Sequence, residues 1–177
     1  MSKLLSDIAV VVRCKPLAAG PNGISVPVTG GGSTGGLSTV RATNPKKLNA
    51  QKLCAGDIVV SADASRFALL LDDSSSLVGK CVNDKGFIII RLASDAEIDI
   101  YMTYIQHVLD EADNKGNFRE VYNNISGGQM AVPDTSQDKV RDIFNRLIAM
   151  REVKETAKKK LDEAIEAEAK AWRELLA

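Results

Sequence analysis

Several features that mark other classes of protein are missing from this chain. It has only three cysteines, Cys14, Cys54 and Cys81, and no C-x-x-C pair, which argues against a disulfide framework and against a zinc site. We expect all three to be buried or half-buried thiols in a reducing cytosol. The apolar run in residues 1–14 is too short to span a membrane and lacks a secretory cleavage site. These absences predict a cytoplasmic protein without a membrane segment.

Signatures of catalysis are equally scarce. The only histidine, His107, lies within a helical pattern, where a structural role is the more common one. No cysteine has a paired histidine motif. A metal-dependent nuclease would need Asp57, Asp63 and Lys80 to come together, but nothing in their spacing requires this. We therefore predict a protein that is not an enzyme, with no catalytic residue, no metal and no cofactor.

The basic excess of a typical DNA-binding protein is also missing, because 23 basic residues are balanced by 23 acidic ones. Either the basic groups are concentrated on one face, or DNA is bound only weakly without a partner. The glycine-rich stretch 29–36 lacks the Lys-Ser/Thr of a nucleotide-binding P-loop. A surface loop is the favoured interpretation of this stretch, with contact to a DNA backbone as the alternative.

The pattern of apolar residues predicts an α+β fold. Residues 8–12 fit a short helix or a strand, after which the chain loosens as far as residue 43. From 44 to 133, strands are expected at 58–61 and 67–71, followed by a hairpin-like pair at 81–82 and 87–92. The spacing of apolar residues then predicts a helix over 98–109, ended by residues 114–117, and a short polar segment leading to Pro133.

Residues 138–176 contain neither glycine nor proline and predict one long C-terminal helix. Apolar residues recur along it at the seven-residue spacing of a coiled coil, interrupted by Lys154 and Glu168. A small domain cannot cover so long a stripe, so the stripe requires a helix from a second copy or from another protein. We expect a compact mixed domain at 1–133 and a spacer or dimerisation helix at 134–177. The residues expected in the helix seam are Val140, Ile143, Leu147, Met150, Ala157, Leu161, Ala164, Ile165 and Trp172.

The order of several short motifs resembles one family. Leu5-Ser6-Asp7-Ile8-Ala9 is similar to the start of a target recognition domain in the specificity subunits of type I restriction-modification systems. The segment 53–59 resembles that family's "leucine, two residues, glycine, aspartate, isoleucine" turn, and 87–92 resembles its central strand. The tyrosine-containing stretch 100–105, and Val132-Pro133 leading through Gln137 into the long helix, also match in order. The chain departs from the family at 134–136 and near Ser65, where an expected glycine is missing.

A complete subunit of that family has two recognition domains and two helices that pair antiparallel, whereas this chain has one of each. The resemblance therefore implies a half-length specificity subunit that reads one half-site of double-stranded DNA and dimerises through its helix. Methylation would belong to modification subunits, with a restriction or translocase subunit as a further partner. Base reading in the major groove requires polar and basic side chains on exposed loops. The residues expected to contact DNA are Arg41, Lys46, Lys47, Ser65, Arg66, Lys115, Asn117 and Arg119.

Two other interpretations remain open from the sequence. The chain fits a coiled-coil adaptor or decoy that binds the methyltransferase subunits without reading DNA, and zero net charge favours this slightly. The metal-dependent nuclease described above is the third.

Overall fold

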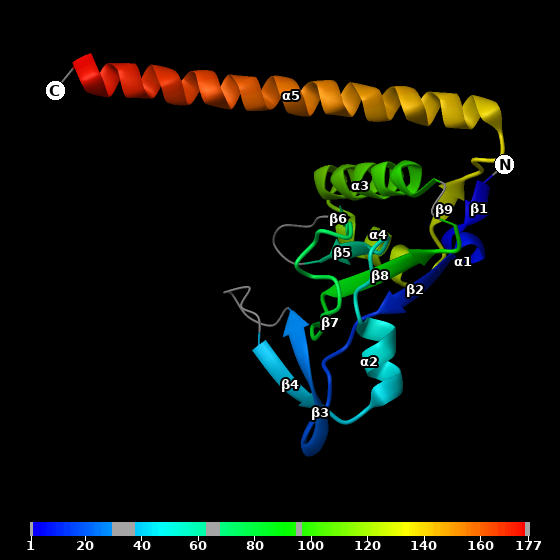
Figure 1. The fold of residues 1–177 in the computed structure, drawn as a ribbon. Coiled ribbons are helices and arrows are strands. Elements are labelled where there is room, and N and C mark those ends of the chain that lie inside the picture. The colour runs from blue at the N-terminus through cyan, green and yellow to red at the C-terminus, as the bar shows by residue number, and fades with distance from the viewer. Residues whose placement is uncertain (1, 30–37, 63–67, 95–96, 176–177) are drawn as a thin grey trace. The chain divides into compact units, whose positions relative to one another are not determined.

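The computed structural model describes residues 2–29, 38–62, 68–94 and 97–175 (Figure 1). The chain divides into two compact units, residues 1–134 and residues 135–177, and each is described by itself. The first unit is a mixed α+β fold with largely antiparallel sheets, and the second contains one long helix.

A four-stranded antiparallel sheet forms the centre of the first unit. Its strand order is β2 (Ala9–Arg13), β8 (Phe87–Leu92), β5 (Ile58–Ser61) and β6 (Ala68–Leu70). Side chains alternate between the two faces of a strand, so Ile58 and Val60 point to one face and Val59 to the other. All three are buried, and so are Ile88, Ile89 and Ile90 of β8. Because both faces of these strands are covered, their sequences are continuous runs of β-branched residues. The sheet therefore has a hydrophobic core on each face.

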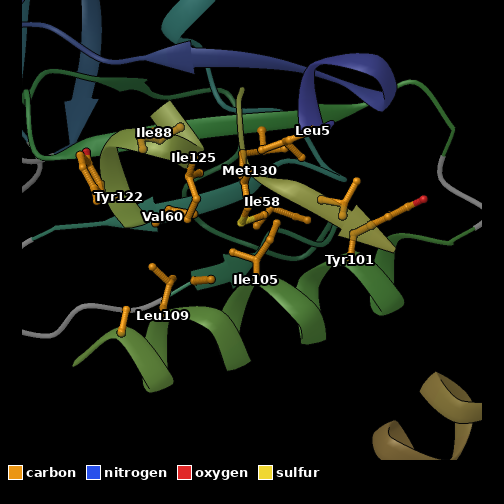
Figure 2. Packing of buried hydrophobic residues seen from close by; sticks show 14 of the residues in the cluster. Leu5, Ile58, Val60, Ile88, Tyr101, Ile105, Leu109, Tyr122, Ile125 and Met130 are labelled. Atoms are coloured by element: carbon orange, nitrogen blue, oxygen red, sulfur yellow. The ribbon is translucent and has the colours of Figure 1, made fainter. Parts of the chain in front are cut away.

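The larger core lies between the sheet and two helices, α3 (Ile98–Lys115) and α4 (Phe118–Ser126). Figure 2 shows Tyr101, Ile105 and Leu109 on the side of α3 that faces the sheet, and all three belong to the same core cluster as Ile58. The three residues are spaced by four, which places them on a single helix face. α3 ends at Gly116, whose φ of 72° is a left-handed conformation that closes the helix at little steric cost.

The smaller core covers the opposite face of the sheet. It consists of Cys14, Leu53, Val59, Leu71, Val82 and Ile89. Beside it, helix α2 (Pro45–Gln51) contacts the short strand β7 (Cys81–Val82). β7 pairs in parallel with β3 (Ala19–Thr29), which pairs antiparallel with β4 (Ser38–Ala42) to give a three-stranded sheet.

The N-terminus is fixed by a separate strand pair. β1 (Ser2–Leu4) lies antiparallel to β9 (Ala131–Pro133), and α1 (Leu5–Ile8) follows directly. Leu5 is fully buried, and its backbone N–H donates to the carbonyl of Met130 at 2.9 Å. The two ends of the first unit are thereby joined.

Several elements confirm the expectations from sequence. The strand at 58–61 and the helix that starts at Ile98 are present, and the helix continues to Lys115 before the expected stop. Residues 8–12 were expected to form either a short helix or a strand, and the structure contains both: α1 ends at Ile8 and β2 begins at Ala9. The second strand is present as β6, and Phe67 lies outside the described residues.

Three expectations were wrong. The segments 81–82 and 87–92 do not form a hairpin, because β8 is already paired on both edges by β2 and β5, so β7 joins the other sheet. The short polar segment expected around 123–128 lies largely in helix α4, which forms because Phe118, Tyr122 and Ile125 reach the core. The segment expected to loosen as far as residue 43 contains β3 and β4, which pair with each other over the described residues 19–29 and 38–42. The glycine-rich stretch lies outside the described residues except for Thr29, the last residue of β3.

The second unit confirms the long helix. α5 runs from Asp138 to Leu175, 38 residues without glycine or proline. Many of its large apolar side chains are exposed, including Leu147 at 46%, Leu161 at 60% and Trp172 at 57%. No helix among the described residues is long and apolar enough to cross a membrane.

The turn that enters β5 depends on a buried ion pair. The Asp57 carboxylate is 2% exposed, and its Oδ1 lies 2.9 Å from Nε of Arg91 in β8. Its Oδ2 accepts from Nη2 of Arg91 at 3.2 Å and from the backbone N–H of Cys54 at 2.8 Å. Gly56 has a φ of 83°, which brings its N–H to 2.8 Å from the carbonyl of Leu71. The bidentate geometry fixes the turn against the sheet.

We predict that Asp57→Ala destabilises the fold strongly. The substitution leaves the Arg91 guanidinium half-buried and the Cys54 N–H without its acceptor, which should cost about 3 kcal/mol in the free energy of unfolding. Urea denaturation followed by circular dichroism measures this. Asp73→Ala removes an exposed carboxylate and is the control, with a change within about 0.5 kcal/mol. Equal stability of the two variants would contradict a structural role for Asp57.

The three thiols should differ sharply in reactivity. Cys14 and Cys81 are buried, as expected, but Cys54 is exposed, which corrects the sequence prediction. Burial raises the pKa of Cys14 to about 12 and also raises the pKa of Cys81. Because the thiolate is the reactive form, we expect a thiol reagent at mildly alkaline pH to modify one group per folded chain rapidly. Mass spectrometry should locate it at Cys54, and Cys54→Ser should abolish it. Rapid modification of Cys14 would contradict this core.

Candidate nucleic-acid interface

Acidic and basic residues are segregated along the first unit. No acidic residue occurs between Asp7 and Asp57, whereas residues 57–134 contain 13 acidic and six basic residues. The stretch without carboxylates contains six basic residues: Arg13, Lys15, Arg41, Lys46, Lys47 and Lys52. Zero net charge therefore results from segments of opposite sign, and it does not exclude an anionic partner.

The fold brings most of these basic residues into neighbouring segments. Arg13 ends β2, Lys15 follows in the connection to β3, and Lys46 and Lys47 lie in α2. The connection contacts α2 directly, because the Lys47 ammonium donates to the carbonyl of Pro16 at 2.6 Å. We call Lys15, Lys46, Lys47 and Lys52 the basic surface. Arg13 is not part of it, because it pairs with Ile88 and so points to the sheet face of the larger core.

A buried amide fixes the two segments of the basic surface together. Gln51, at the end of α2, is 2% exposed. Its Oε1 accepts from the N–H of Lys15 at 3.1 Å, and its Nε2 donates to the carbonyl of Lys15 at 2.9 Å and to that of Val82 at 2.6 Å. The backbone of Lys15 is thereby positioned by side-chain contacts while its side chain stays exposed.

The charged groups of the basic surface are accessible to a ligand. Lys15, Lys46 and Lys52 are exposed, and Lys47 is half-buried against Pro16. The adjoining turn contributes one carboxylate, Asp84, whose Oδ1 accepts from the N–H of Gly86 at 2.8 Å. A cluster of accessible cations with few carboxylates is suited to contact successive phosphates.

The residues expected to contact DNA fall into separate places. Lys46 and Lys47 belong to the basic surface, and Arg41 lies in β4 with its backbone opposite Ser25. Ser65 and Arg66 lie outside the described residues. Lys115, Asn117 and Arg119 lie at the junction of α3 and α4, and Figure 1 shows α3 and α2 on opposite sides of the central sheet. The fold therefore does not unite the expected residues in one site.

The surroundings of the α3–α4 junction differ in charge from those of the basic surface. The Lys115 ammonium pairs with the Glu111 carboxylate at 2.8 Å. Asp110 and Asp113 lie on the same last turns of α3, and Glu120 follows in α4. These carboxylates would repel phosphate, so the junction is the weaker candidate of the two.

Sequence analysis missed Lys15 and Lys52, which lie beside and at the end of α2. The signal that identifies them is the 8–56 stretch without a carboxylate, which net charge over the whole chain conceals.

Other candidate sites are less well formed. Within the described ranges, no group of three or more histidine, cysteine, aspartate or glutamate residues is placed to hold a metal ion. The Asp57 carboxylate is committed to Arg91 and Cys54, and the Lys80 ammonium donates to the Ser76 carbonyl. Asp63 lies outside the described residues. His107 is exposed on α3, with its Nε2 3.7 Å from the Glu111 carboxylate.

Comparison with known proteins gives no further guide, since no family model, curated protein or solved structure matches this chain.

Proposed function

We propose that this chain is the DNA sequence-recognition subunit of a methyltransferase complex of the type I restriction-modification kind. Each copy reads one half-site through its first unit and dimerises through α5, while catalysis belongs to partner subunits. The observation that carries the proposal is the basic surface, a cluster of accessible cations within a stretch of 49 residues that has no carboxylate.

Electrostatics explains how a chain of zero net charge binds DNA. Phosphate contacts supply much of the affinity of a protein for DNA. At physiological salt the Debye length is about 8 Å, so charges farther than this from the DNA are largely screened and the local charge facing the DNA matters most. The four residues of the basic surface carry a formal charge of +4. Helix α3, which is rich in carboxylates, lies on the opposite side of the central sheet from α2 (Figure 1), and this asymmetry favours one orientation of the protein on the duplex.

The turn at 53–57 supports the resemblance in physical terms. A glycine is required at 56 because of its positive φ, and an aspartate at 57 because its carboxylate joins Cys54 to Arg91. The guanidinium of Arg91 also donates to the carbonyl of Lys52, one of the basic residues. The motif that suggested the family thus has a defined role next to the basic surface.

In this proposal α5 forms the dimer interface. Ile143, Leu147, Leu161, Ile165 and Trp172 are exposed and lie on one side of α5 at the spacing of a helix seam. A second helix would remove this apolar surface from water. Two copies related by a two-fold axis would present two recognition units and read an inverted repeat, with the helices fixing the spacing.

We predict that the basic surface, and not the α3–α4 junction, sets the affinity for duplex DNA. Lys46→Gln with Lys52→Gln should lower the affinity about tenfold and reduce the slope of log K against log salt by about 0.9 for each phosphate that the replaced lysines neutralise. Lys115→Gln with Arg119→Gln removes the same charge from the junction and should change little. Fluorescence anisotropy with a random-sequence duplex over a salt series measures both pairs of variants. An equal fall in affinity for both pairs would contradict the assignment of the interface.

We predict that Leu147→Lys with Leu161→Lys converts a dimer into a monomer, because two buried apolar contacts become buried charges. Asn145→Lys with Thr156→Lys adds the same charge on the opposite side of α5 and should leave the dimer intact. Light scattering distinguishes the two states. A dimer that survives the leucine substitutions would exclude α5 as its seam.

The whole proposal is tested by co-expression with the adenine methyltransferase subunit encoded nearest to this chain. Methylation of one split, palindromic motif, mapped on genomic DNA, would support the recognition role. A stable complex that leaves DNA unmethylated would favour the non-reading adaptor or decoy. Failure to form any complex would refute the assignment to this kind of system.

A further inference from the structure

The apolar row of α5 is interrupted in a symmetric way. Leu147, Lys154, Leu161, Glu168 and Leu175 follow one another at intervals of seven along one side of the helix. Lys154 and Glu168 have opposite charges and lie seven residues on either side of Leu161. Neither has an ion-pair partner within its own chain among the residues that the structure describes.

The charge of α5 changes sign at the same point. Residues 151–160 contain five basic and two acidic residues, for a formal charge of +3. Residues 161–170 contain four acidic residues and one basic residue, for a formal charge of −3. The two segments are equal in length and opposite in charge, with the boundary next to Leu161.

We propose that α5 binds the α5 of a second copy of this chain in antiparallel orientation, centred on Leu161. This rests on the part of the proposed function that assigns dimerisation to α5, and it adds the register and the residues that select it. In this register Lys154 lies level with Glu168 of the second copy, and the reverse holds on the other side of the two-fold axis. The basic segment of each helix lies along the acidic segment of the other.

The apolar residues fit the same register. Leu147 lies level with Leu175 of the second copy, and Met150 lies level with Trp172, so both ends of the paired region are apolar. The overlap from Leu147 to Leu175 is roughly 42 Å long, since a helix rises 1.5 Å per residue. In a parallel pair in register, Lys154 would face Lys154 and Glu168 would face Glu168. Like charges at facing seam positions disfavour that arrangement.

Charge reversal tests the register in the full chain. Lys154→Glu and Glu168→Lys each turn two attractive contacts of the antiparallel dimer into repulsive ones, so each should raise the dimer dissociation constant about tenfold at low salt. The double variant exchanges the two charges and should restore dissociation close to that of the unaltered chain. At about 1 M salt the Debye length is about 3 Å, so the differences in dissociation constant between the variants should largely vanish.

Two matched controls lie on the far side of the helix. Lys170 and Glu152 are nine residues from Leu161 in either direction, which places them half a turn round the helix from the seam. Lys170→Glu and Glu152→Lys repeat the charge changes of the two seam variants and should leave dissociation unchanged. Sedimentation equilibrium over a range of protein concentrations measures all six proteins.

The outcomes separate the register from dimerisation itself. A dimer that is insensitive to both single reversals, or that is not restored by the double variant, overturns the antiparallel register and leaves dimerisation through α5 standing. An unaltered chain that stays monomeric at high concentration overturns both, and α5 then binds a different protein. Weaker dimers in the single variants with recovery in the double variant establish the register.

Discussion

The contact between Asp57 and Arg91 is the interaction on which the first unit depends. It joins the turn at 53–57 to the central strand β8, and the same guanidinium reaches the carbonyl of Lys52 immediately after α2. The helix that carries Lys46 and Lys47 is thereby tied to the middle of the sheet. A buried carboxylate is stable only with such partners, since leaving either charge unpaired would cost several kcal/mol. The ion pair therefore links the stability of the fold to the position of the basic surface.

Acidic and basic residues are unevenly distributed over the first unit, although the net charge of the whole chain is zero. All charged residues in the 8–56 stretch are basic, whereas α3 and its surroundings are rich in carboxylates. The central sheet separates these groups because α3 and α4 cover one face and the smaller core lies on the other. An anionic ligand would meet an attractive surface on one side and a repulsive one on the other, which orients it before any specific contact forms.

The long helix poses a different physical problem. Its backbone hydrogen bonds are satisfied within the helix, but an isolated helix gains no tertiary burial for side chains such as Leu161 and Trp172. Another helix is the natural cover for a stripe of this length. In the proposed pair, the charges at Lys154 and Glu168 would cost apolar contact and would select one arrangement of the two helices.

The amino-acid sequence by itself determined the local elements: α5, because no glycine or proline interrupts it; α3, because its apolar residues recur at helical spacing; and β5, because its residues are β-branched. Only the tertiary structure decided the rest. β7 and β8 belong to different sheets because β8 has no free edge, and α4 forms because three side chains find the core. Lys15 and α2 meet because the buried Gln51 side chain bonds the backbone of Lys15. These outcomes depend on contacts between distant residues, which local pattern does not encode.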